Sequence, residues 1–159
     1  MSGREHHYRL GLRWTGNTGA GTATYGGYRR DHDLIADGKP PILATADPVF
    51  RGDPGRWNPE ELLVAALSSC HQLSYLSLCA RAGISIVSYE DEAEGTMVEV
   101  GDGGSFTSVT LRPRVVVAAG ADLAKAEALH HTAHEQCFIA SSVTCPVGCE
   151  AIVEVESAG

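Results

Sequence analysis

The sequence predicts an α+β fold built around a long central helix. Runs of strand-like pattern are separated by two helix signals, without the strict strand–helix alternation of a parallel α/β protein. The length of 159 residues suits one domain, so we assign residues 1–159 to a single domain. A chain of this size can bury roughly 68–70% of its unfolded surface, so it needs neither disulfides nor a structural metal to fold.

The first third of the chain is predicted to form strands and a long loop. Residues 8–14 alternate in part between apolar and polar side chains, which indicates a half-buried strand. Residues 22–28 and 32–35 can form a hairpin arm, although Gly26 and Gly27 weaken its register. Four of the seven prolines fall within residues 37–57, and this density predicts a long loop of the kind that is often functional.

The long central helix is predicted from residue 59 to about residue 82. Asn58 is a good N-cap, Pro59 suits the first helical position, and Glu60 and Glu61 face the positive end of the helix dipole. Gly83 supplies the C-terminal stop. Apolar residues occupy most of its circumference, so we expect packing on all sides. Polar residues interrupt the stretch too often for a membrane span.

The second half predicts two long strands, a second helix and a final strand. Residues 84–100 and 106–118 are expected to pair antiparallel across a glycine-rich turn. Asp122 can cap a helix that runs to about residue 140, and residues 151–156 alternate like a strand.

Composition excludes several classes of function. The net charge of −8 argues against a general binder of nucleic acid, which would carry a basic surface. The polar N-terminus lacks the apolar segment of a secretory signal, so we expect a cytoplasmic protein that does not act at a membrane. Thiols stay reduced in the cytosol, and the five cysteines are therefore fillers, metal ligands or redox groups.

The cysteines offer more than one chemistry. Cys70 lies mid-helix, and Cys79 suits the core. His130, His134 and Cys137 share one face of the second predicted helix, where they could bind zinc together with Cys70 or His71. The same face could equally place Cys137 beside Cys70. Cys145 and Cys149 lack the spacing of a redox pair, and we treat them as incidental unless a turn at Pro146 brings them together.

Three features of the chain occur together: a helix start, a cysteine ten residues after its first glutamate, and a second cysteine near the start of the last quarter of the chain. The segments are Asn58-Pro59-Glu60-Glu61-Leu62-Leu63, Ala65-Ala66-Leu67-Ser68-Ser69-Cys70-His71 and His134-Glu135-Gln136-Cys137-Phe138-Ile139-Ala140. Over about residues 14–155, this combination resembles the OsmC/Ohr family of thiol peroxidases. Ohr-type members differ, since they carry Phe after the first cysteine and Cys-Pro at the second.

The resemblance implies an intertwined homodimer with antiparallel sheets packed around the long helix and the second helix. It implies reduction of organic hydroperoxides, and less efficiently of hydrogen peroxide, with electrons from a dithiol such as protein-bound lipoyl. Neither a cofactor nor a metal is implied. By position, Cys70 matches the peroxidatic cysteine, Cys137 the resolving cysteine and Glu60 the active-site glutamate. The thiolate-stabilising arginine corresponds to Arg51, with Arg30 as its rival.

Helix geometry favours a site shared between subunits. Glu60 and Cys70 are ten residues apart on one predicted helix, hence ~15 Å apart along its axis. One arginine cannot easily contact both residues in the same subunit, so we expect them to come from different chains of a dimer. The competing hypotheses are a non-catalytic thiol or small-molecule binding protein on the same fold, and the zinc site described above.

Overall fold

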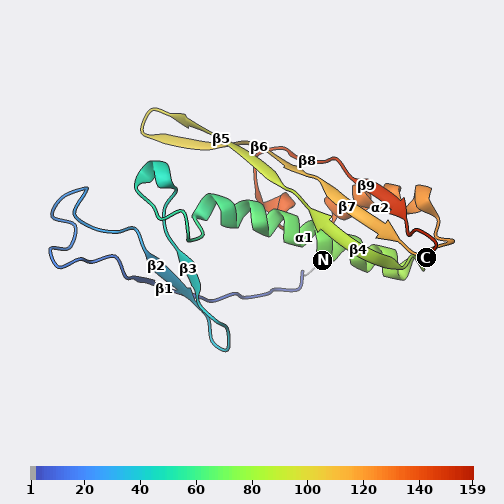
Figure 1. The fold of residues 1–159 in the computed structure, drawn as a ribbon, viewed down its shortest axis with the longest axis horizontal. Coiled ribbons are helices and arrows are strands. Elements are labelled where there is room, and N and C mark those ends of the chain that lie inside the picture. The colour runs from blue at the N-terminus through green and yellow to red at the C-terminus, as the bar shows by residue number, and fades with distance from the viewer. Residues whose placement is uncertain (1–2) are drawn as a thin grey trace. The chain divides into compact units, whose positions relative to one another are not determined.

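The computed structural model describes residues 3–159, and it shows the predicted mixed α+β architecture (Figure 1). The chain divides into two compact units, Met1–Leu62 and Leu63–Gly159, and each is described by itself. The sheets contain both antiparallel and parallel pairs, and two α-helices accompany them.

The first unit is built on a small antiparallel sheet. Strands β1 (Gly11–Trp14), β2 (His32–Ile35) and β3 (Ile42–Ala44) pair in the order β1-β2-β3. The prediction for residues 22–28 was wrong, because turns replace the first arm of the hairpin. The expected long loop holds β3 and a short 3₁₀ helix, η1 (Pro48–Phe50). Strand β3 was not predicted from its local sequence, and it is formed by antiparallel pairing with β2.

The long helix α1 (Pro59–Arg81) begins and ends where the sequence predicts. Asn58 and Glu61 form a reciprocal capping box: Asn58 Oδ1 accepts from the Glu61 N–H at 2.8 Å, and Glu61 Oε2 accepts from the Asn58 N–H at 3.1 Å. At the other end, Gly83 has φ +75°, and the Ile84 N–H donates to the Cys79 carbonyl at 2.9 Å. This is the Schellman arrangement that a glycine stop allows.

Only one stripe of α1 is buried within this chain. The buried residues recur every four positions, at Leu67, His71, Tyr75 and Cys79. Leu73 is 64% exposed, so the expectation of packing on all sides was wrong for the single chain. The helix α1 is long and apolar enough to cross a membrane, but core helices of soluble proteins often have the same length and composition. In its most apolar stretch of 18 residues, 22% of the residues are buried.

The second unit contains two three-stranded sheets. The strands predicted over residues 84–100 and 106–118 are each broken in two, so four strands replace the expected pair. One sheet has the order β4-β7-β9 and the other β5-β6-β8. Their bounds are β4 Ile86–Asp91, β5 Glu94–Val100, β6 Gly103–Leu111, β7 Pro113–Val117, β8 Val147–Cys149 and β9 Ile152–Val155.

The side chain of Asp91, at the end of β4, forms hydrogen bonds near the breaks between β4 and β5 and between β6 and β7. The Asp91 carboxylate accepts from the Arg112 N–H at 2.7 Å and from the Ser68 hydroxyl. The C-terminal strands then join by parallel pairing, β8 to β6 and β9 to β7. Strand β8 was not predicted, because three residues with a glycine carry little strand signal.

The second helix, α2 (Leu123–Glu135), begins as predicted but ends earlier. Asp122 accepts from the Lys125 N–H at 3.0 Å and caps the first turn. The helix ends at Glu135 rather than near residue 140, and a 3₁₀ turn, η2 (Ala140–Ser142), follows. Cys137 therefore lies just beyond the helix and not on the helical face assigned to it.

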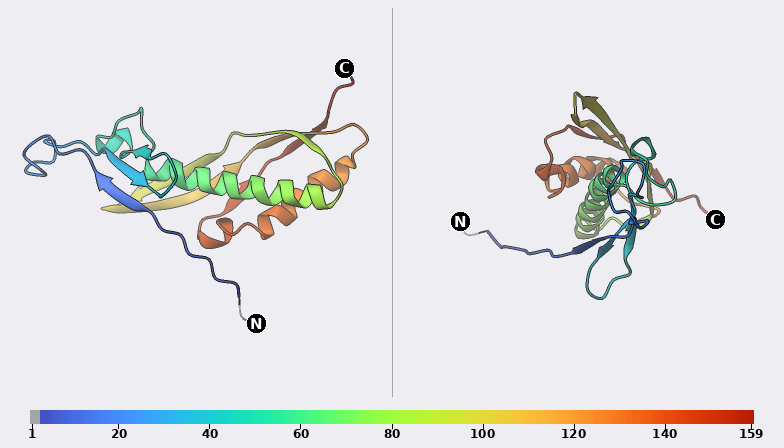
Figure 2. Two further views of the ribbon diagram at one scale, coloured as in Figure 1. Left: turned by 90° about the horizontal axis from the view of Figure 1, so that it is seen from below. Right: turned by 90° about the vertical axis from the view of Figure 1, so that its left-hand side faces the viewer.

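Within the second unit, α1 and α2 lie on the same side of the strands (Figure 2). Side chains from both helices and from strands β7 and β9 form one buried core cluster that includes Tyr75, Ala133, Val115 and Val153. A second cluster is formed around Leu67 of α1 with residues of β6. Together these clusters fix the middle of α1, which carries Cys70 and His71, against α2 and the sheets.

Candidate active site

Cys70 and Cys137 are neighbours in the second unit. Cys70 lies on α1 and is partly exposed, whereas Cys137 follows α2 and is only 1% exposed. The Cys70 side chain is close enough to Cys137 to raise the pKa of its thiol, and both cysteines are free thiols. The structure thus brings together two of the residues that sequence reasoning selected, from elements far apart in the chain.

The surroundings of the two sulfurs differ. Burial raises the pKa of Cys137, and the neighbouring Cys70 side chain raises it further, whereas the Ala140 N–H, 3.4 Å from the sulfur, acts in the opposite direction. Cys137 is therefore held as a thiol at neutral pH. Cys70 is the more accessible of the two sulfurs, as a nucleophile must be.

Cys70 opens onto a cavity of about 620 Å³ between α1 and the segment after α2. Two apolar side chains on its wall are strongly exposed, Leu73 at 64% and Phe138 at 82%. Arg81 and Glu135 add charged groups to the wall. A largely apolar cavity with few charged groups suits a small organic molecule.

The remaining predicted site residues lie in the first unit or at the start of α1. Glu60 lies in the first turn of the helix, where the dipole favours a carboxylate. Arg51 follows η1 in a left-handed conformation, with φ 68°. Its guanidinium lies against the backbone of Gly26, where a Cβ atom would approach Nη2 to 3.4 Å.

Arg30 is engaged in local contacts. Its guanidinium donates to the Tyr28 carbonyl at 2.6 Å and the Tyr25 carbonyl at 2.7 Å, and it stacks on both tyrosine rings. Through these contacts Arg30 stabilises the conformation of its own loop. Arg51 has no ion pair among residues 3–159. The roles of both arginines and of Glu60 remain predictions.

The continuity of α1 bears on how Glu60 could act. The helix runs without a break from Pro59 to Arg81, so the ten residues between Glu60 and Cys70 correspond to ~15 Å along the axis. A single arginine side chain does not span that separation easily.

The structure groups His130 differently from the predicted zinc site. Its ring lies beside His71 and Cys149, while His134 and Cys137 are not part of this cluster among the described residues. Cys149, taken as incidental in the sequence, is thus a neighbour of two buried histidines. Seventy-eight residues separate it from His71, and no local pattern in the sequence could have paired them.

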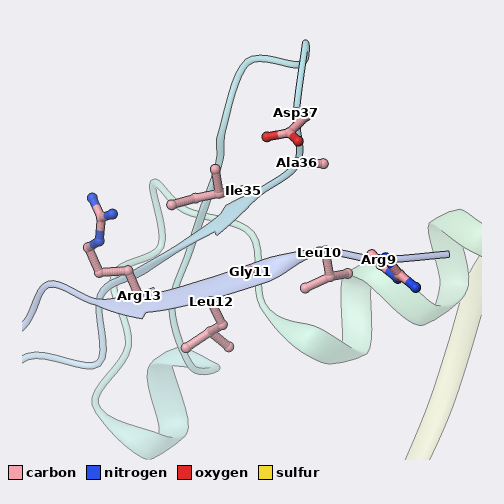
Figure 3. Close-up of a pocket in the computed structure, with 8 residues that line it drawn as sticks. All are labelled: Arg9, Leu10, Gly11, Leu12, Arg13, Ile35, Ala36 and Asp37. Atoms are coloured by element: carbon pink, nitrogen blue, oxygen red, sulfur yellow. The ribbon is translucent and has the colours of Figure 1, made fainter.

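Another hollow, of about 390 Å³, lies along β1 in the first unit (Figure 3). Its lining includes Arg9, Arg13 and Asp37, but no cysteine or histidine. Leu10 and Leu12 point to one side of the strand, and Ile35 and Asp37 lie on the other. Because its side chains do not converge on one point, this hollow is not a candidate active site.

Comparison with known proteins identifies the family. The family model described as OsmC-like protein matches residues 52–151, which is more than half of the chain. The chain belongs to the OsmC-like protein family. An OsmC-like protein of unknown function from Vibrio cholerae is 37% identical, with a TM-score of 0.83 over 93% of this chain and 100% of that one.

Other OsmC-like relatives are more distant. The Bacillus subtilis protein YmaD, described as uncharacterized, is 26% identical over 87% of each chain. A structure from Legionella pneumophila, described as an organic hydroperoxide resistance protein OsmC, is 20% identical, with a TM-score of 0.65 over 95% of this chain and 100% of that one. At this identity the likeness establishes the OsmC-like fold of the present chain.

Proposed function

We propose that this protein is a cysteine-based peroxidase that reduces organic hydroperoxides, and hydrogen peroxide less efficiently. The observation that carries the proposal is the contact between partly exposed Cys70 and buried Cys137 at the edge of an apolar cavity. Membership of the OsmC-like family supports a redox role. The relative from Legionella pneumophila is described as an organic hydroperoxide resistance protein.

The reaction begins with the Cys70 thiolate. Its sulfur attacks one peroxide oxygen, the O–O bond breaks, and the alkoxide leaves and takes up a proton as the alcohol. Cys70 becomes a sulfenic acid, the first reversible product of thiol oxidation. The neighbouring Cys137 sulfur then attacks that sulfenic acid, so that a disulfide forms and water is released.

An external dithiol closes the cycle. One of its sulfurs attacks the Cys70–Cys137 disulfide, and the second resolves the mixed disulfide, so the dithiol is oxidised and both thiols of the protein return. A lipoylated protein is a suitable reductant of this class. We place the cycle in the cytoplasm, where such thiols are kept reduced.

The second part of the site comes from a dimer in this proposal. Arg51 of the partner subunit stabilises the Cys70 thiolate and hydrogen-bonds the peroxide oxygens, because its guanidinium is always charged and offers a fixed fork of donors. Glu60 of the partner subunit orients that arginine. The ~15 Å between Glu60 and Cys70 on one helix supports this division between two chains.

The test compares single-cysteine variants in an organic-hydroperoxide assay with a dithiol reductant. Cys70→Ser should abolish consumption, whereas Cys137→Ser should retain one turnover and then stop, because no intramolecular disulfide can form. Cys145→Ser is the matched control and should retain activity. Mass spectrometry of peroxide-treated protein should show the Cys70–Cys137 disulfide.

Two results of this test would reject the peroxidase and favour a binding function. Full activity in Cys70→Ser, or no Cys70–Cys137 disulfide after peroxide treatment, would reject the peroxidase. The apolar cavity beside Cys70 would then favour a non-catalytic thiol or small-molecule binding protein on the same fold.

A further inference from the structure

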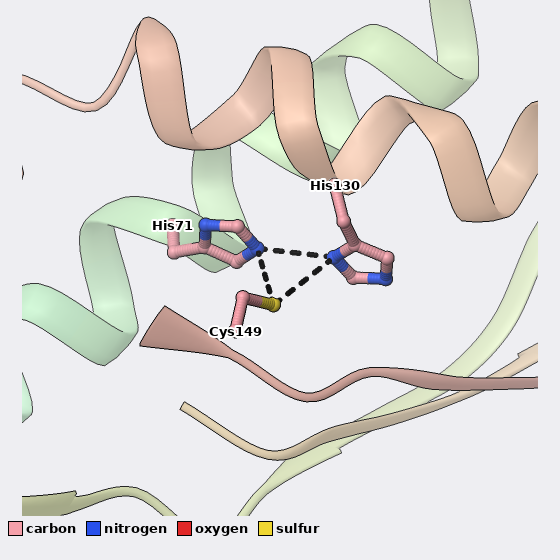
Figure 4. A group of neighbouring side chains, drawn as sticks. All are labelled: His71, His130 and Cys149. Atoms are coloured by element: carbon pink, nitrogen blue, oxygen red, sulfur yellow. Dashed lines mark hydrogen bonds between the residues drawn. The ribbon is translucent and has the colours of Figure 1, made fainter. Parts of the chain in front are cut away.

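Three potential metal ligands converge in the second unit, apart from the Cys70–Cys137 pair. His71 comes from α1, His130 from α2, and Cys149 from the end of β8. Figure 4 shows both ring nitrogens and the sulfur directed toward one another. The distances are 3.0 Å from His71 Nε2 to His130 Nδ1, 3.7 Å from His71 Nε2 to Cys149 Sγ, and 4.0 Å from His130 Nδ1 to Cys149 Sγ.

These distances match the edges of a tetrahedral metal site. Zinc bonds of ~2.0–2.1 Å to nitrogen and ~2.3 Å to sulfur place two nitrogens ~3.3 Å apart, and a nitrogen and a sulfur ~3.6 Å apart. The three observed separations lie within a few tenths of an ångström of those values. Small side-chain shifts would let one ion contact all three atoms.

Hydrogen bonding within the cluster does not account for it. One proton can lie between the two rings, and His71 Nδ1 and His130 Nε2 are then left buried without a partner within residues 3–159. Both are the nitrogens on the far sides of the rings from Cys149, so they do not face the space between the three converging atoms. The observation that points to a ligand is the convergence of His71 Nε2, His130 Nδ1 and Cys149 Sγ within 4.8 Å of one another.

The protonation states of the two histidines suit metal binding, whereas the thiol of Cys149 must lose its proton. Burial lowers the pKa of His71, with the charge of His134 adding to this effect and that of Asp91 opposing it, and burial beside His71 lowers the pKa of His130 to about 4. Both rings are therefore neutral at pH 7 and carry the lone pairs that a metal requires. Burial raises the pKa of Cys149 to about 11, with Asp91 adding to the shift. Metal binding would release this thiol proton to solvent.

Neighbouring residues hold the cluster and leave it accessible. The Tyr75 ring stacks on His130 at 3.7 Å between centroids, and the Tyr75 hydroxyl donates to the Ala126 carbonyl at 3.0 Å. His130 and Cys149 also line a cavity of about 580 Å³, together with Glu127, His131, His134, Val147 and Ala151. An ion could enter from this side, and water could supply its fourth ligand.

We propose that His71, His130 and Cys149 form a binding site for one Zn²⁺ ion. Imidazole and thiolate ligands select zinc and similar transition metals over Mg²⁺ and Ca²⁺, which prefer oxygen. Three protein ligands with one position open to a cavity correspond to an open zinc site rather than a closed structural one. The site shares no ligand with the Cys70–Cys137 pair, although His71 directly follows Cys70 in the chain.

The test titrates the reduced, metal-free full-length protein with Co²⁺ and then with Zn²⁺. The expected result is one equivalent of Co²⁺ with an intense near-ultraviolet thiolate-to-cobalt charge-transfer band, which one equivalent of Zn²⁺ removes. Cys149→Ser should lose the band, and His130→Gln should weaken Zn²⁺ binding by about a hundredfold or more. Two controls should bind normally: Cys145→Ser, four residues before Cys149 in the chain, and His131→Gln, whose side chain lines the same cavity as His130 and Cys149.

Two further measurements keep the result decisive. The double variant Cys70→Ser/Cys137→Ser should still bind one Zn²⁺, and loss of binding there would place the metal on the redox pair and overturn the proposal. Zn²⁺ should also protect Cys149, but not Cys145, from alkylation in the unsubstituted protein, a readout that needs no variant to fold. The absence of a stoichiometric cobalt band, or an unchanged band in Cys149→Ser, would likewise overturn it.

Discussion

Position within the fold separates the five cysteines into different environments. Cys79 is fully buried in the core cluster, where burial raises the pKa of its thiol and keeps it inert. Cys137 is also buried, but its sulfur meets Cys70 at the edge of a cavity. Cys149 lies beside two imidazoles. Reactivity is thus set by what surrounds each sulfur rather than by the number of cysteines.

Gly95 illustrates how closely one residue can constrain packing. A Cβ atom at this position would lie 2.7 Å from both Val64 Cγ2 and Phe106 Cε1. Both of those side chains are partly buried and pack against the cluster around Leu67. Glycine at position 95 therefore allows β5 to lie close to its neighbours.

Gly95→Ala should destabilise the protein by about 1–3 kcal/mol, the usual cost of overpacking a core. Urea unfolding followed by circular dichroism measures the change. Gly103→Ala is the matched control, since a Cβ at this strand position meets nothing within 4 Å. The control should change stability by less than about 0.5 kcal/mol. Equal stability of the two variants would contradict the close packing at Gly95.

The start of α1 is stabilised by hydrogen bonds between residues that are close in sequence. Asn58 is only 5% exposed, and its reciprocal hydrogen bonds with Glu61 satisfy backbone N–H groups that a helix start leaves without partners. The orientation of the first turn also fixes Glu60, the neighbouring candidate for the active site. Capping therefore connects the stability of the element with the position of a proposed functional carboxylate.

Asn58→Ala should cost about 1 kcal/mol of unfolding free energy, within a range of roughly 0.5–2 kcal/mol, because the cap of the first turn is lost. Thermal and urea unfolding measure the effect. Glu61→Gln keeps a side-chain acceptor for the Asn58 N–H, so this control should stay close to the unsubstituted protein. If Asn58→Ala is as stable as Glu61→Gln, the capping box contributes nothing.

At the scale of the whole molecule, much apolar surface is exposed for a single chain. In the second unit, Leu73 and Phe138 are 64% and 82% exposed, and in the first unit Leu10 and Leu12 are 69% and 64% exposed. Exposed apolar patches mark interaction surfaces in soluble proteins. This exposure supports the homodimer that the proposed shared site requires.

Leu73→Glu should shift the protein from dimer to monomer, because a charge at a buried interface position costs several kcal/mol unless it is paired. Analytical ultracentrifugation measures the change in mass. Leu73→Ala introduces no charge and should remain dimeric. An unsubstituted protein that is monomeric at micromolar concentration and fully active as a peroxidase would reject the shared site.

The sequence by itself determined the α+β class and both helix starts, and through the OsmC/Ohr resemblance it predicted the two cysteines of the proposed redox pair. Asn58 and Asp122 could be identified because each caps backbone groups within a few residues, so the signal and its effect lie in one short window. The OsmC/Ohr resemblance depended on motifs of the same local kind around Cys70 and Cys137.

Only the tertiary structure decided how distant segments combine. The early end of α2 placed Cys137 beyond the helix, and the parallel pairing of β8 with β6 aligned Cys149 with Leu111. The contact between Cys149 and His71 then depends on packing across seventy-eight residues of chain. Such contacts follow from which surfaces are buried together, and that information is shared among several elements rather than written in any one segment.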